Sequence, residues 1–202
     1  MGVKIKYRTK LDNTKDILKN IPKLNGKKVE VGCFNGEHAW LAGIHEYGCT
    51  ITPKRGQYLT VPVSPKAAGK KAGDFSDLFV VQANSGEKFL ARDRKNGDIE
   101  LLFWLAKSVK IPERSFLRAG HDEYINEVIK KAEKLLSLVI DGKMSDQQYI
   151  DTVGQMLSSK IKKYARDLTS PANTSAAVET KGSSNPLKDT GSMINGISWR
   201  TK

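Results

Sequence analysis

The sequence predicts an α+β fold, in which a small, twisted and mostly antiparallel sheet carries two long helices of the C-terminal half. Three patterns support this prediction. Residues 76–110 hold three short apolar strands separated by glycine turns, and residues 122–140 repeat apolar side chains at helical spacing. Residues 145–168 repeat them again behind a capping box. A chain of 202 residues suits one domain of ordinary size, so we expect a single domain over residues 1–202.

The N-terminal region is expected to form a short helix followed by a strand. Five side chains of residues 9–21 are spaced to lie on or beside one helix face: Leu11, Thr14, Ile17, Leu18 and Ile21. Pro22 ends this helix. Residues 27–34 then alternate, with Val29 and Val31 pointing one way, which predicts a half-buried strand.

A second short helix is expected over residues 39–47. Trp40, Ile44 and Tyr47 are spaced four and three apart, which places them on one face, and we expect Tyr47 to pack inward. Gly48 is suited to end this helix in the left-handed region. Residues 50–63 return to alternation and predict one further strand.

The middle of the chain reads as a β-meander insertion, at about residues 76–110, with Gly86 and Gly97 in its hairpin turns. It is preceded by residues 64–75, which are small, basic and rich in Gly and Ala, and which predict a mobile loop. A second mobile loop is expected over residues 169–185, where large apolar side chains are few.

The helix over residues 122–140 has a wide apolar stripe, and the next helix begins at the capping box of Ser145 and Gln148. Apolar side chains then recur along that second helix at steps of three and four: Ile150, Val153, Leu157, Ile161, Tyr164 and Leu168. After residue 186 the sequence predicts a turn near Met193 and Ile194 and a final strand.

Charge is unevenly placed along the chain. The net charge is +12, of which residues 1–30 carry +6 (nine basic, three acidic) and residues 154–202 carry +5 (eight basic, three acidic). Basic ends suit a polyanion such as DNA or an acidic protein surface, so a basic DNA-binding module is one alternative. No apolar run is long enough to cross a membrane, and the charged start does not resemble a signal peptide, so we expect no membrane partner.

The short stretch from residue 42 to residue 50 suggests possible chemistry, because a His and a Glu are adjacent in it. Together, Cys33, His38, His45 and Cys49 provide the atoms of a tetrahedral zinc site, although their spacing matches no standard zinc motif. A zinc-dependent enzyme is therefore a weaker alternative.

A thiol enzyme is a further alternative, and it is weaker than the zinc enzyme. Cys33 ends a strand near the histidines, but no orienting acid or oxyanion loop is evident. The Asp189-Thr190-Gly191 triplet is better explained as a turn than as half of an aspartic-protease dyad. Neither glycine-rich phosphate motif occurs.

Several motifs taken in order resemble one known family. They are "VEVGCF", "AWLAGIHEYG", "YLTVPV", "KIPERSFLRAG" and, after the two helices, "NPLKDTGSMINGISWR". This series resembles the tail-completion and virion-morphogenesis (neck, head–tail joining) proteins of tailed bacteriophages, over residues 27–199. The motif positions are His45–Gly48, Ile111–Leu117 and Pro186–Ile194. Ser115 departs from the family pattern, in which Pro is more frequent.

The resemblance implies a structural virion protein of the neck or tail end, with no catalysis, no cofactor and no metal. Such a subunit forms a ring with copies of itself, often a hexamer, that caps the tail tube protein and docks the head-completion or connector protein. DNA passing through the channel is a further contact. The expected location is the virion, after assembly in the host cytoplasm.

In that framework the His-Glu pair is a helix terminus rather than a reactive centre. We expect His45 or Glu46 to bond neighbouring backbone in the turn that Gly48 closes. Arg114 is expected to hold a carboxylate or a carbonyl, and Phe116 and Leu117 to fix the start of the long helices in the core.

Overall fold

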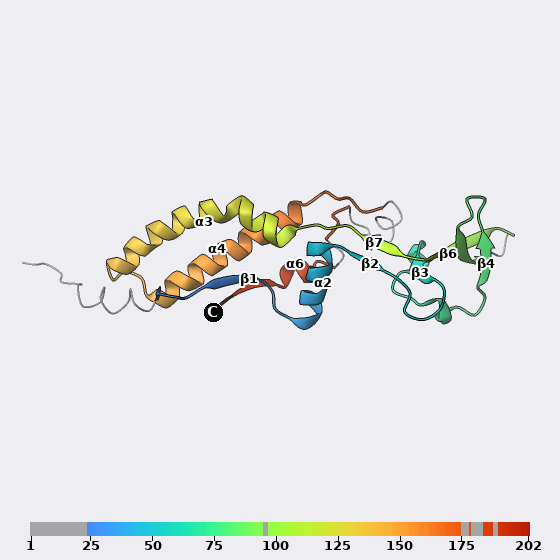
Figure 1. The fold of residues 1–202 in the computed structure, drawn as a ribbon, viewed down its shortest axis with the longest axis horizontal. Helices are drawn as coiled ribbons and strands as arrows, with labels where there is room; N and C mark the ends of the chain where they lie inside the picture. Colours follow the sequence, from blue (N-terminus) through green and yellow to red (C-terminus); the bar gives the residue numbers. More distant parts are fainter. Residues whose placement is uncertain (1–23, 95–96, 175–177, 179–183, 188–189) are drawn as a thin grey trace, which may run out of the picture.

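The structure is a computed structural model that describes residues 24–94, 97–174, 178, 184–187 and 190–202. It is elongated, with a pair of long helices at one end and a β-meander at the other (Figure 1). The expected helix over residues 9–21 lies outside the described residues, as do Asp189 and part of the expected loop over residues 169–185.

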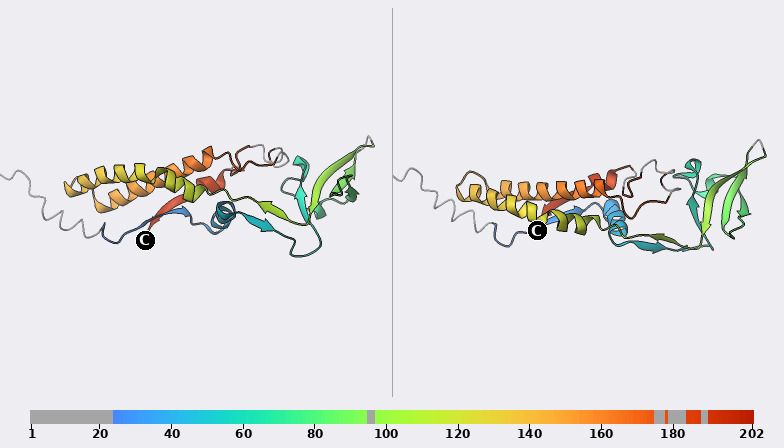
Figure 2. Two further views of the ribbon diagram at one scale, coloured as in Figure 1. Left: turned by 45° about the horizontal axis from the view of Figure 1, so that its top comes forward. Right: turned by 90° about the horizontal axis from the view of Figure 1, so that it is seen from above.

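The α+β prediction is confirmed, and the strands that the structure describes form three antiparallel sheets. β1 (Val29–Cys33) pairs with β8 (Ile197–Thr201), and β2 (Cys49–Ile51) pairs with β7 (Val109–Ile111). The third sheet has the order β3-β6-β5-β4 and consists of β3 (Leu59–Pro62), β4 (Phe79–Gln82), β5 (Lys88–Asp93) and β6 (Ile99–Ala106). The β2–β7 ribbon connects this meander to the helical end (Figure 2).

The two predicted long helices are α3 (Phe116–Ile140) and α4 (Asp146–Asp167), which pack against each other. The capping box is confirmed: Ser145 Oγ accepts from Gln148 N at 3.1 Å, and Gln148 Oε1 accepts from Ser145 N at 3.0 Å. Helix α3 begins at Phe116, six residues before the start of the predicted apolar stripe. Its first turn is stabilised by Glu46, which is distant in the sequence.

The main core lies between α2 (Gly36–Tyr47), the long helices and the β1–β8 ribbon. Phe116, Ile194 and Ile197 are almost fully buried in it, as predicted for Phe116. Gly154 of α4 lets Trp199 of β8 approach closely, because a Cβ at residue 154 would lie 2.3 Å from Trp199 Cδ2. The turn expected near Met193 is the short helix α6 (Ser192–Asn195), and Gly191 before it has a φ of +82°.

The meander has a smaller core of its own. Residues 64–75, for which the sequence predicts a mobile loop, contribute to it and form the 3-10 turns η1 (Pro65–Ala67) and η2 (Ala72–Asp74). Ala67 and Phe75 pack against β6, where the Phe75 and Phe103 rings meet edge to face at 5.7 Å. Small apolar residues of this segment therefore fill space against the sheet.

The single strand expected over residues 50–63 is wrong in one respect, because it is divided into β2 and β3. Pro53 and Gly56 lie between them, and Gly56 has a φ of +82° that a strand residue does not adopt. The two hairpin glycines are confirmed, since Gly86 and Gly97 have φ values of +84° and +79°.

Candidate docking interface

We call the end of α2, His45–Gly48, the His-Glu corner, and its polar groups bond to the start of α3. Helix α2 ends at Tyr47, and Gly48 follows with φ +68° and ψ 165°. The positive φ agrees with the prediction, but the ψ lies outside the left-handed helical region. A Cβ at residue 48 would lie 2.7 Å from Glu113 N and 2.9 Å from Ile111 O, so only glycine fits where α2 passes the start of α3.

Glu46 caps the N-terminus of α3. Its carboxylate accepts bonds from Leu117 N at 2.8 Å, Arg118 N at 3.0 Å and Ser115 Oγ at 3.0 Å. Burial by itself would raise the pKa of Glu46, but these bonds and the one from Arg118 Nε lower it below its ordinary value. A negative charge at a helix N-terminus is favourable, so Glu46 joins α2 to α3 and allows α3 to begin at Phe116.

Arg118 completes this link on the exposed side. Its Nε donates to Glu46 Oε1 at 2.9 Å, and its Nη2 donates to Glu113 Oε1 at 2.6 Å. The guanidinium also lies over the Tyr47 ring, 4.7 Å from the centroid. The pair of acids therefore holds one Arg across the junction of the two helices.

Arg114 is buried and holds carbonyl oxygens, which is one of the two partners predicted for it. Its Nε donates to Pro171 O at 2.9 Å, and its Nη2 lies 3.4 Å from Ala172 O and 3.3 Å from Asn173 Oδ1. Nη1 lies 3.4 Å from His45 Nδ1, and burial lowers the pKa of Arg114. The chain after α4 is thereby fixed to the His-Glu corner.

The third motif meets the same region through Asn185, which the sequence analysis missed. Its side-chain amide donates to Arg166 O at 2.7 Å and to Leu168 O at 3.1 Å at the end of α4. Pro186 and Leu187 follow and are buried. An Asn before a Pro-Leu pair is only a weak sequence signal for a helix cap, because the sequence does not identify the helix end that the amide binds.

The expectation that Tyr47 packs inward is wrong. Trp40 and Tyr47 are 68% and 67% exposed, whereas Ala42 and Glu46 are the buried residues of α2. A small residue allows α2 to approach its neighbours closely, and Glu46 must point inward to reach α3. The two large aromatics, seven residues apart, therefore share the outer face of the helix.

The four zinc candidates have separate surroundings. Cys33 Sγ donates to Met193 O at 3.7 Å, the His38 ring lies against Gly196, His45 contacts Arg114, and Cys49 belongs to β2. Within the described part of the chain, no group of three His, Cys, Asp or Glu side chains is placed to hold a metal ion. Burial raises the pKa of the Cys33 thiol, which is opposite to the activation that a nucleophile needs.

One face of the meander is apolar and partly exposed. Strand register places Val61, Trp104, Phe89 and Val81 in one row across the four strands. Phe79, Ala91 and Leu101 form a second row on the same face, because a bulge in β6 absorbs the extra residue between Leu101 and Trp104.

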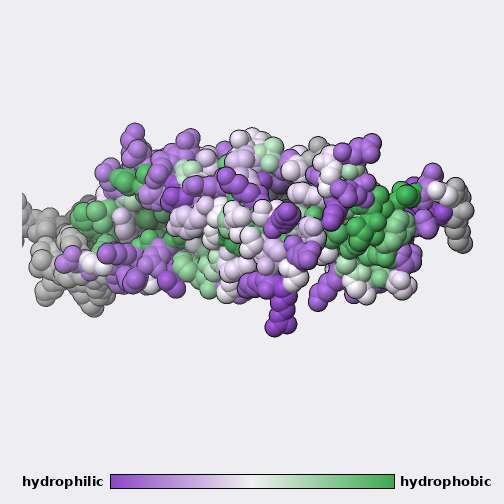
Figure 3. Space-filling model, turned by 45° about the vertical axis from the view of Figure 1, so that its right-hand side comes forward, coloured by the Kyte–Doolittle hydropathy of each residue, from purple (hydrophilic) through white to green (hydrophobic). Residues whose placement is uncertain are grey.

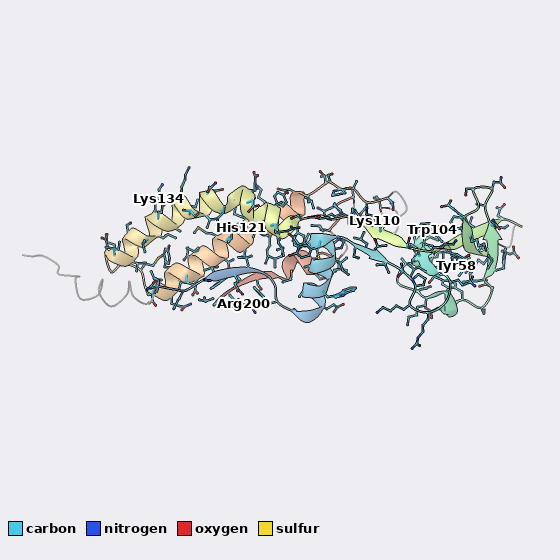
Figure 4. All side chains as sticks on the ribbon, in the orientation of Figure 1. Tyr58, Trp104, Lys110, His121, Lys134 and Arg200 are labelled. Atoms are coloured by element: carbon cyan, nitrogen blue, oxygen red, sulfur yellow. The ribbon has the colours of Figure 1, made fainter. Side chains whose placement is uncertain are left out.

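Exposure along this face is high for large apolar side chains. Phe79 is 37% exposed, Leu101 41% and Ile99, at the end of β6, 52%. The 3-10 turns pack on the opposite face, against Phe103 and Leu90. Figure 3 shows hydrophobic surface over the meander. Trp104, which belongs to this face, lies far from His121 and Lys134 of α3 (Figure 4). We call the two rows and Ile99 the meander face.

No protein-family model, curated protein or solved structure matches the chain. Among the helices that the structure describes, none is both long and apolar enough to span a membrane.

Proposed function

We propose that this chain is a structural protein of the neck or tail end of a tailed bacteriophage virion, acting in tail completion or head–tail joining. In this proposal it forms a ring with copies of itself, as a hexamer by analogy with the family that its motifs resemble. The ring caps the tail tube protein and docks the head-completion or connector protein. The observation that carries the proposal is the meander face, where Phe79, Ile99 and Leu101 expose apolar surface at one end of the molecule. Contiguous exposed apolar surface of this kind is characteristic of protein docking.

A second surface of different composition supports a ring. Trp40 and Tyr47 expose aromatic side chains on α2, away from the meander face (Figure 1). A subunit that presents two unlike surfaces makes heterologous contacts, and these close into a ring when the rotation between subunits permits. Exposed aromatics are common anchors of such contacts.

The His-Glu corner supports a mechanical role. Hydrogen bonds join α2, α3 and the chain after α4, and they are made by Glu46, Arg114 and Arg118. The end of α2 and the start of α3 carry two of the motifs named above, and they meet where the β2–β7 ribbon leaves the helical end. A rigid junction there sets the position of the meander relative to the helices, which a ring subunit needs in order to match two neighbours.

The outer strands of the meander offer a further mode of contact. Among the strands that the structure describes, β3 and β4 each pair on one side only, which leaves their other edges open to a neighbouring chain. Extended segments of other subunits can add to such edges through backbone hydrogen bonds.

Electron microscopy of a deletion mutant tests this proposal. In the phage that encodes the chain, removal of the gene is expected to give filled heads beside unjoined tails, with joining restored by the wild-type gene in trans. Mass spectrometry of purified particles is expected to detect the chain. Normal joined particles from the mutant, or absence of the chain from virions, would contradict the proposal.

A basic DNA-binding module is the second candidate, and one surface favours it. A groove of about 770 Å³ between α3, α4 and β8 is lined by Lys131, Lys160 and Lys163, together with Trp199. Two of these lysines are partly neutralised, because Glu127 binds Lys131 at 2.8 Å and Lys160 at 2.6 Å. Retention of the protein on duplex DNA that weakens steeply with salt would favour this function.

A further inference from the structure

Helix α2 exposes two large aromatic side chains on one face. The helix lies across the long axis of the molecule and projects from it (Figure 1). Trp40 and Tyr47 are 68% and 67% exposed, more than any other large hydrophobic residue that the structure describes. Aromatic rings carry a large apolar area, so two of them exposed on one face of a helix indicate a contact with another protein surface.

Two glycines share this face with the aromatic side chains. Four residues at steps of four, three and four form one stripe along the helix, which we call the α2 stripe: Gly36, Trp40, Gly43 and Tyr47. A Cβ at Gly36 or Gly43 would meet nothing within 4 Å, and neither residue has a positive φ. Glycine is unfavourable inside a helix, and no contact within the described chain requires it at Gly43. Close approach by another molecule does require it, because glycine leaves room beside the backbone.

The α2 stripe is complementary to its own copy in the antiparallel direction. Its spacing is the same from both ends, whereas the order of small and large side chains is reversed. When a second α2 lies antiparallel, Trp40 of each copy therefore comes opposite Gly43 of the other. Tyr47 comes opposite Gly36 in the same alignment. The rings then fill the spaces that the glycines leave, as the side chains of two packed helices do when they interdigitate.

Charge and area set the strength of such a pair. The alignment brings Glu37, in the first turn of α2, toward Arg118 of the second copy, whose guanidinium lies over the Tyr47 ring. Arg118 also binds Glu113, so this attraction is weak. A helix face of 12 residues is about 18 Å long and about 10 Å wide, well below the roughly 800 Å² per partner of a stable interface. The contact area therefore limits the pair to a weak and reversible association.

We propose that two copies of the chain pair through antiparallel α2 helices, with Trp40 of each copy against Gly43 of the other. Tyr47 then lies against Gly36 at both ends of the contact. This pairing does not depend on the proposed function. In the proposed ring the same face contacts a neighbouring subunit, so the pair belongs to the free protein and separates when the subunit assembles. The pair thereby covers an apolar face before assembly.

Sedimentation velocity of the purified full-length protein tests the pairing. The wild type is expected to shift from monomer toward dimer between roughly 1 and 100 μM, the range of a weak interface. Trp40→Gly removes one ring, and Gly43→Trp sets a second ring against Trp40. Each variant is expected to weaken association by at least about tenfold. A wild type that stays monomeric over this range, or unchanged association of either variant, would overturn the proposal.

The double variant Trp40→Gly/Gly43→Trp tests the register. It exchanges a large and a small position of the α2 stripe, so the antiparallel alignment again sets a tryptophan opposite a glycine. Its association is expected to be stronger than that of either single variant, because the two changes are coupled across the contact. A double variant that associates no better than the single variants would overturn the proposed register.

Gly43→Ala separates pairing from folding. The variant is expected to raise the Tm of the monomer through helix propensity and to weaken association, because its methyl group occupies the space that Trp40 of the second copy fills. Val80→Ala, at an exposed position of the meander, is the control and is expected to leave association unchanged. Wild-type association of Gly43→Ala, or an equal loss in Val80→Ala, would show that the contact lies elsewhere and would overturn the proposal.

Discussion

Arg118 and Glu46 are joined three times: the Arg118 Nε and backbone N both donate to Glu46 Oε1, at 2.9 and 3.0 Å, and Arg118 Nη2 donates to the Glu46 backbone oxygen at 3.1 Å. Helix α2 is thereby bonded end to end with α3. Together with Arg114, which holds the chain after α4, this contact makes the centre of the molecule a fixed junction between the helices and the meander.

Replacement of Glu46 is expected to weaken this junction. Glu46→Gln removes the charge and brings an amide NH₂ group against backbone N–H donors, so we expect a loss of about 2–3 kcal/mol in the free energy of unfolding. Urea denaturation measures this loss. Glu37→Gln changes an exposed carboxylate in the first turn of the same helix and is the matched control. Equal stability of the two variants would show that the cap contributes little.

Acid is expected to destabilise the meander through Glu100. Hydrogen bonds from Lys66 and Arg92, with a further one from Arg94, lower the pKa of this buried carboxylate from 4.5 to about 2. Between these two values the unfolded chain binds more protons than the folded one, so stability falls as the pH decreases through that window.

Calorimetry provides the measurement for Glu100. The decrease in Tm from pH 5 toward pH 2 is expected to be smaller in Glu100→Gln than in the wild type, because the variant lacks this protonation step. Glu123→Gln, on the exposed surface of α3, serves as the control and is expected to follow the wild type. A Glu100→Gln curve parallel to the wild type would refute the assignment.

Two helix glycines are expected to respond to alanine with opposite signs. Gly154→Ala brings a Cβ within 2.3 Å of the Trp199 ring, so β8 must shift away from α4 at a cost of about 1–3 kcal/mol. At Gly43 of α2 a Cβ meets nothing within 4 Å, and Gly43→Ala is expected to stabilise the protein by about 0.5–1 kcal/mol through helix propensity. Chemical denaturation of both variants measures the difference, and a stable Gly154→Ala protein would indicate a looser α4–β8 contact.

Charges on the meander face are expected to prevent assembly without unfolding the subunit. Leu101→Asp changes an exposed side chain of this face, whereas Val80→Asp changes an exposed apolar side chain of β4 on the opposite face. We expect Leu101→Asp to weaken subunit or partner binding by at least about tenfold and to fail in complementation of the deletion mutant. Val80→Asp is expected to complement, and failure of both variants would point to general damage of the meander.

The features that could be predicted correctly are those that depend on near neighbours in the chain. The capping box of Ser145 and Gln148, the hairpin glycines Gly86 and Gly97, and the apolar period of α4 are set by residues within a few positions of each other. Local backbone geometry is sufficient for these, and so the α+β class and the meander could be predicted.

Tertiary structure alone decided which faces are covered. Glu46 is buried and Tyr47 exposed because the start of α3, about 70 positions later, requires a carboxylate at its N-terminus. Residues 50–63 are divided because β2 pairs with β7, some 60 residues away, while β3 pairs with β6. These arrangements are stabilised by contacts between segments that are distant in the sequence. The periodicity of one segment does not predict which other segment it contacts.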